Sequence, residues 1–79
     1  MVVINKHTFF RVIKAAFEQR RKTLPNALAA GFGEMTKDEL ANAVTYCGHS
    51  PDVRGERLTV AEFCELSNVI YNALKDNDK

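Results

Sequence analysis

Three consecutive cations, Arg20, Arg21 and Lys22, are the residues of this sequence whose types and spacing best suit a polyanion. An arginine side chain can pair bidentately with phosphate and can also stack on an exposed base. Lys14, and less clearly Arg11, lie on the polar side of the segment before them. Charges that offset a helix dipole would explain one or two of these cations. Nucleic-acid binding and a purely structural or protein-binding role both stay open.

A second group of charges stands in the stretch "RGER", where Arg54 and Arg57 flank Glu56. One interpretation is a network that fixes a loop, in which Glu56 or a carboxylate from a helix holds one arginine. The other interpretation adds both guanidinium groups to a basic surface.

The charges are distributed unevenly along the 79 residues. Residues 1–30 contain six Lys and Arg against one Glu, and residues 31–79 contain five against nine Asp and Glu. The two parts therefore carry net charges of +5 and −4, although the whole chain carries only +1. Such a pattern is typical of a protein with one end facing a polyanion, and chance segregation is the alternative.

Residues for catalysis or metal binding are scarce. His7 and His49 are far apart in the sequence, and no glycine pattern spells a phosphate-binding loop. Cys47 and Cys64 form no CxxC motif and occupy apolar helical positions, so we expect two buried thiols and no metal site. The sequence therefore predicts no active site of its own.

Length and composition indicate one soluble domain that covers residues 1–79. No stretch is long and apolar enough for a membrane span, and no signal-peptide core is present. We expect a cytoplasmic monomer that does not bind membranes.

Apolar residues recur with helical periodicity from residue 6 to about residue 18, where they share one arc: Phe9, Phe10, Val12, Ile13, Ala16 and Phe17. The same spiral would carry Arg20 into the middle of that arc, where an unpaired charge is costly. The helix should therefore bend or end near Gln19, or Arg20 must be paired with a carboxylate or buried carbonyls.

Three further helices follow from local signals. Thr23 can cap a second helix with Pro25 in its first turn. Capping boxes, in which a threonine is followed three positions later by a glutamate, begin at Thr36 and Thr59. No segment alternates as a strand would. The sequence predicts an all-α bundle of four main helices, with an ordered arginine-containing loop before the last helix.

Two blocks resemble a known family. Residues 9–28, "FFRVIKAAFEQRRKTLPNAL", and residues 54–70, "RGERLTVAEFCELSNVI", are similar to the opening and closing elements of the C-terminal helical domain of the small-subunit ribosomal RNA adenine dimethyltransferases. The blocks occur in the family's order and at about its spacing. Gly55, where the family often has alanine, is a minor departure.

The resemblance implies an S-adenosylmethionine-dependent enzyme that dimethylates two adjacent adenosines of small-subunit rRNA during ribosome biogenesis. The cofactor and the chemistry belong to an N-terminal Rossmann-like catalytic domain, whose motifs are missing here. The chain is then expected to bind no cofactor, to be unable to methylate alone, and to have its catalytic domain and the rRNA as partners.

Carried over to this sequence, the basic signature of the family falls on Lys14, Arg20, Arg21 and Lys22, which the resemblance assigns to phosphate contacts, with Arg54 and Arg57 second. A structural pairing of Arg20 stays open. The alternative function is a protein-interaction module that docks on the catalytic domain or on an assembly factor. A helix-turn-helix DNA binder is disfavoured because no helix rich in exposed Arg, Asn or Gln follows a short glycine-containing turn.

Overall fold

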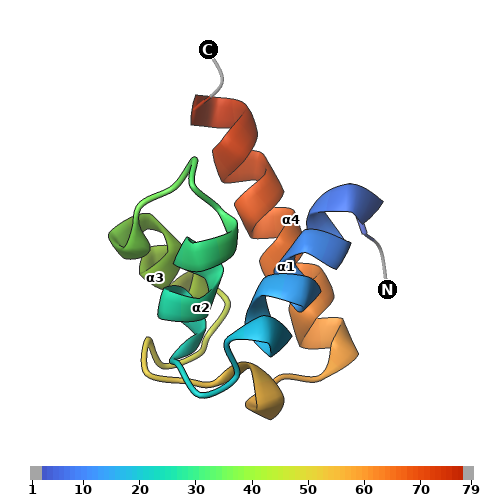
Figure 1. The fold of residues 1–79 in the computed structure, drawn as a ribbon. Helices are drawn as coiled ribbons and strands as arrows, with labels where there is room; N and C mark the ends of the chain where they lie inside the picture. The colour runs from blue at the N-terminus through green and yellow to red at the C-terminus, as the bar shows by residue number, and fades with distance from the viewer. Residues whose placement is uncertain (1–2, 78–79) are drawn as a thin grey trace.

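The computed structural model describes residues 3–77, which form four α-helices and no strand. The helices are α1 (Lys6–Glu18), α2 (Leu24–Gly31), α3 (Lys37–Tyr46) and α4 (Val60–Asn77), and a short 3₁₀ helix, η1 (Gly55–Arg57), precedes α4 (Figure 1). The predicted all-α fold with four main helices is confirmed. In the described part of the chain, no helix is both long and apolar enough to cross a membrane.

The predicted helix starts are correct, because local hydrogen bonds determine them. At the start of α3, Thr36 accepts a hydrogen bond from the amide of Glu39, whose carboxylate accepts one from the amide of Thr36. Thr59 and Glu62 exchange the same two bonds before α4, at 3.2 and 2.8 Å. Thr23 precedes α2 as expected, although its hydroxyl accepts from the side chain of Asn26 rather than from a backbone amide.

The buried face of α1 differs from the arc that the sequence predicted. Thr8, Val12, Ala15 and Ala16 are buried, whereas the expected core residues Phe10 and Phe17 are 64% and 50% exposed. The reason is the close packing of α1 through its small residues. A Cβ built on Gly31 of α2 would lie 2.7 Å from the Cβ of Ala15, and one built on Gly55 would lie 3.1 Å from that of Ala16. Large rings do not fit at such distances, so they lie outside the contact.

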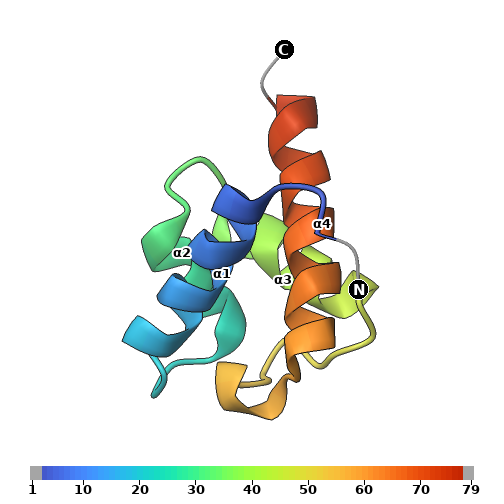
Figure 2. The same cartoon turned by 90° about the vertical axis from the view of Figure 1, so that its right-hand side faces the viewer.

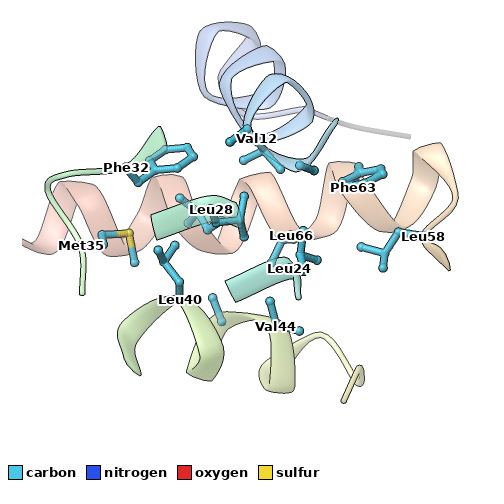
Figure 3. Close-up of a cluster of buried hydrophobic side chains, with 14 residues drawn as sticks. Val12, Leu24, Leu28, Phe32, Met35, Leu40, Val44, Leu58, Phe63 and Leu66 are labelled. Atoms are coloured by element: carbon cyan, nitrogen blue, oxygen red, sulfur yellow. The ribbon is translucent and has the colours of Figure 1, made fainter. Parts of the chain in front are cut away.

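All four helices contribute to one hydrophobic core (Figure 3). The fully buried side chains include Val12 of α1, Leu24 and Leu28 of α2, Leu40 and Val44 of α3, and Leu66 and Ile70 of α4. Burial of each such side chain contributes about 1.5–3 kcal/mol to the free energy of unfolding, before the ordering entropy is subtracted. This core sets the positions of the loops at both ends of the helices.

Two loops lie at one end of the molecule. In Figures 1 and 2, the turn after α1 and the segment around η1 are both at the bottom, and the C-terminal end of α4 is at the top. The first residues of α1 are in the upper half of both views, away from these loops. The two basic segments of the sequence are in these lower loops.

Candidate nucleic-acid interface

The turn between α1 and α2 presents Arg20, Arg21 and Lys22, here called the basic corner. Gln19 leaves the helical region with φ −122° and ψ 45°, and the amide of Lys22 donates to its carbonyl at 2.9 Å. Of the alternatives that the sequence left open, the structure has the helix end near Gln19. Because it ends there, Arg20 is exposed instead of entering the apolar arc.

The side chains of the basic corner are free of ion pairs and side-chain hydrogen bonds with any residue among 3–76. The buried pairing that was left open for Arg20 is not formed within that part of the chain. All three side chains are exposed to solvent. Three adjacent positive charges without internal compensation raise the local potential for anions.

The basic corner is attached through the backbone to residues 54–57, here called the second basic segment. Just after the corner, the amide of Leu24 donates to the carbonyl of Val53 at 2.6 Å. Gly55, which is buried, lies against Ala16 in the last turns of α1, and α1 contacts η1. The segment around η1, which includes Arg54 and Arg57, is consequently at the same end of the bundle as the turn after α1 (Figure 2).

In the second basic segment, the backbone and not the side chains holds the loop. The amide of Arg57 donates to the carbonyl of Arg54 at 3.0 Å, and that of Leu58 donates to Gly55 at 3.1 Å. Arg54, Glu56 and Arg57 are exposed, and within the described residues no ion pair joins Glu56 to either arginine. The loop-fixing side-chain network considered for this segment is therefore not formed there.

An open hollow of about 390 Å³ is lined by residues of this loop: Ser50, Asp52, Val53, Arg54, Glu56 and Arg57. It contains two carboxylates as well as two guanidinium groups. An anion inside it would meet like charges, so the arginines are better suited to contact an extended phosphate backbone across the surface.

Lys14 is exposed on α1, one turn before Glu18. Its Nζ lies 3.7 Å from Glu18 Oε1 in an i, i+4 pair, with 76% and 58% of the two side chains exposed. Such a surface pair contributes about 0.3–0.5 kcal/mol and is easily exchanged for another partner. Lys14 can therefore still reach a phosphate, although part of its charge is compensated.

Arg11, in contrast, is a structural residue. Its guanidinium donates to both carboxylate oxygens of Glu34, at 2.5 and 2.7 Å, and to the carbonyl of Gly31 at 3.0 Å. It also lies 4.3 Å from the centre of the Phe32 ring. These contacts join α1 to the end of α2 and remove Arg11 from the surface available to phosphate.

The Arg11–Glu34 pair shifts the pKa values of both of its side chains. The hydrogen bond from Arg11 lowers the pKa of Glu34 to about 2, with a smaller contribution from its own backbone. The hydrogen bond to Glu34 raises the pKa of Arg11. Both groups stay charged across the physiological range.

Phe17, which the sequence placed in the core, lies at this end of the molecule instead. Its ring is half exposed and rests on the buried ring of Phe63, with centroids 5.9 Å apart and planes inclined by 51°. Helical periodicity did not predict this exposure, because it placed Phe17 within the apolar arc of α1.

The two cysteines are free thiols, as expected. Cys64 is buried, whereas Cys47 is only partly buried. Burial raises the pKa of the Cys47 thiol, and the negative charge of the nearby Glu65 raises it further. Across the described residues, no group of three or more His, Cys, Asp or Glu could hold a metal ion.

No protein-family model matches this chain. Over 72 residues it is 46% identical to Ribosomal RNA small subunit methyltransferase A of Streptococcus pneumoniae strain Hungary19A-6, and equally to those of strains CGSP14 and ATCC 700669 / Spain 23F-1. Each match covers 89% of this chain and 25% of the relative, in its C-terminal part. The chain thus spans about a quarter of the length of these relatives. Its resemblance to the C-terminal domain of these methyltransferases is confirmed.

Proposed function

We propose that this chain is the C-terminal domain of a methyltransferase acting on small-subunit rRNA, and that it binds rRNA through the basic corner and the second basic segment. Methylation of adenosines with S-adenosylmethionine, in the cytoplasm during ribosome biogenesis, is the function proposed for the parent protein. The chemistry belongs to a catalytic domain that this chain would accompany, as a monomer. The 46% identity to the C-terminal part of rRNA methyltransferases supports this proposal.

One observation supports the binding surface above all others. The hydrogen bond between Leu24 and Val53, at 2.6 Å, brings five exposed cations from two distant segments to one end of the bundle. Glu18, Asp52 and Glu56 are the nearby carboxylates in the sequence, so positive charge is in excess there. A polyanion binds such a surface because each neutralised phosphate releases condensed counterions.

The proposed division of roles follows from the contacts. Arg20, Arg21 and Lys22 contact the phosphate backbone directly, since nothing within the described chain competes for them. Arg54 and Arg57 extend the same track. Lys14 contacts the same phosphate backbone once its ion pair with Glu18 has opened.

A salt series tests the proposal. The affinity of the 79-residue chain for immature small ribosomal subunits is measured between about 50 and 200 mM salt, beside the double variant Arg21→Ala/Lys22→Ala. The matched control is Lys6→Ala/Lys75→Ala, because both lysines are exposed and lie away from the basic corner. Lys6 is the first residue of α1, and Lys75 is in the last turn of α4. It removes the same charge from the other end of the molecule.

We expect steep weakening with salt, and a slope shallower by roughly one to two in the corner variant, as the loss of phosphate contacts requires. The control should keep nearly the parental slope. Binding that does not respond to salt would favour the alternative function, a module that docks on the catalytic domain or on an assembly factor. Equal effects of the two double variants would mean that net charge, and not the basic corner, determines binding.

A further inference from the structure

The half-exposed ring of Phe17 is in the last turn of α1, three residues before the basic corner begins, and its position suggests a role that charge alone does not supply. We propose that Phe17 is a stacking platform for an unpaired RNA base, so that this domain recognises single-stranded or looped nucleotides beside the phosphates that its cations contact. This inference rests on the proposed rRNA-binding function.

The ring is held in place from behind. Phe63, only 3% exposed, supports it at a centroid distance of 5.9 Å. Phe63 is itself fixed between α1 and η1, because its Cζ lies 3.7 Å from the position that a Cβ on Gly55 would take. A surface ring that is already ordered loses little conformational entropy when a ligand stacks on it. Phe17 therefore has the rigid backing that a stacking site requires.

The charges around Phe17 favour a nucleotide over an apolar protein side chain. Lys14 lies three residues before it on the same side of α1. Arg20 and Arg21 follow directly in the turn that begins after α1. Phe63 also lies against η1, which ends in Arg57. A base stacked on the ring would place its flanking phosphates within reach of these cations. An aromatic ring next to a basic track is the common arrangement in proteins that bind single strands.

Base pairing decides which RNA can use this site. In a duplex, each base is stacked between its neighbours and its face is inaccessible to a side chain. In loops, bulges and ends the bases can turn outward onto aromatic rings. The domain should therefore prefer RNA with unpaired nucleotides over fully paired RNA of equal charge.

Three variants separate stacking from charge. Phe17→Leu keeps apolar bulk on Phe63 but removes the ring, and Phe17→Trp keeps a ring and adds a fluorophore to a chain that has no tryptophan. Phe10→Leu is the matched control, because Phe10 is also exposed on α1 but lies seven residues, about two turns, further from the corner. Thermal melting verifies that each variant is folded.

Affinities are measured by fluorescence anisotropy, at one salt concentration, for a labelled RNA hairpin with an unpaired loop and for a fully paired RNA of equal length. We expect Phe17→Leu to weaken hairpin binding by at least about fivefold and duplex binding by less than about twofold. Phe10→Leu should change neither affinity. The fluorescence of Phe17→Trp should be quenched by the hairpin and much less by the duplex.

Parental hairpin affinity in Phe17→Leu, or unchanged fluorescence of Phe17→Trp at saturating hairpin, would overturn the stacking site. The proposed function would survive that result if Arg21→Ala/Lys22→Ala still weakened binding. Equal losses in Phe17→Leu and Phe10→Leu would also overturn it, because the exposed apolar face of α1 would then act as a whole. Failure of the parental chain to bind either RNA at low salt would contradict the proposed function itself, and the stacking site with it.

Discussion

The amide of Leu24 donates a hydrogen bond to the carbonyl of Val53 at 2.6 Å, and this contact joins the two basic segments of the chain. Leu24 is fully buried, so the turn that precedes it is fixed by the core as well as by this bond. The loop that contains Val53 continues into η1, whose Gly55 lies against Ala16. The backbone of the basic end is therefore determined by packing, while Arg20, Arg21 and Lys22 form no ion pair within the described residues.

The close approach of α1 and α2 predicts a steric cost at Gly31. A Cβ at this position would lie 2.7 Å from the Cβ of Ala15, a distance that requires the two helices to separate. We expect Gly31→Ala to lower the free energy of unfolding by about 1–3 kcal/mol in urea denaturation. Gly33→Ala is the control, because nothing lies within 4 Å of its Cβ position, and it should leave stability unchanged or raise it by up to about 1 kcal/mol. Equal effects of the two changes would contradict this packing.

The Arg11–Glu34 pair predicts a specific loss of stability in acid. The pKa of Glu34 is lowered from 4.5 to about 2 in the folded chain, so the unfolded chain binds more protons between these values. The contribution of the pair is complete above pH 4.5 and is lost as the pH falls toward 2. The free energy of unfolding of Glu34→Gln, measured by urea denaturation, should fall less across this range than that of the parental chain.

Near neutral pH, Glu34→Gln should cost about 1 kcal/mol or less, because 48% of the Glu34 side chain is exposed and solvent screens the pair. The pKa of Glu62 is also lowered, chiefly by a hydrogen bond from the backbone of Thr59, and this contribution is common to both proteins. Identical pH profiles for the two proteins would show that the pair does not form in solution.

The capping box of α4 predicts the effect of Thr59→Ala. The Thr59 hydroxyl accepts from the amide of Glu62 at 3.2 Å, and Thr59→Ala removes this hydrogen bond from the first turn of α4. The expected cost is about 0.5–2 kcal/mol in thermal or urea unfolding. Thr45→Ala provides the contrast, since Thr45 is exposed within α3 and its hydroxyl only donates to the Ala41 carbonyl. That change should be neutral or slightly stabilising, because alanine has the higher helix propensity.

The predictable features of this fold are those that depend on neighbours in the sequence. The capping boxes at Thr36 and Thr59 mark helix starts because both partners are three residues apart. The end of α1 near Gln19 was predictable because Arg20 would otherwise enter an apolar face.

Features that depend on distant residues were not predictable. The Arg11–Glu34 pair spans 23 positions, and periodicity alone placed Arg11 among the free surface cations. Phe10 and Phe17 were assigned to the core because helical periodicity identifies an apolar arc but not which part of it a neighbour covers. That choice depends on the small residues Ala15 and Ala16, and on the glycines of two other segments that pack against them.

The central claim is that rRNA is bound at the basic end of the bundle, and backbone amide chemical shifts test it most directly. The ¹⁵N-labelled chain is titrated with a small-subunit rRNA hairpin at about 150 mM salt. The amide chemical shifts of residues 20–24 and 53–57 should change and reach saturation. The amide chemical shifts of α3, which carries none of the proposed contacts, should not change. Shifts centred on α3, or on the first turns of α1 around Phe10 with the basic corner unmoved, would contradict the claim.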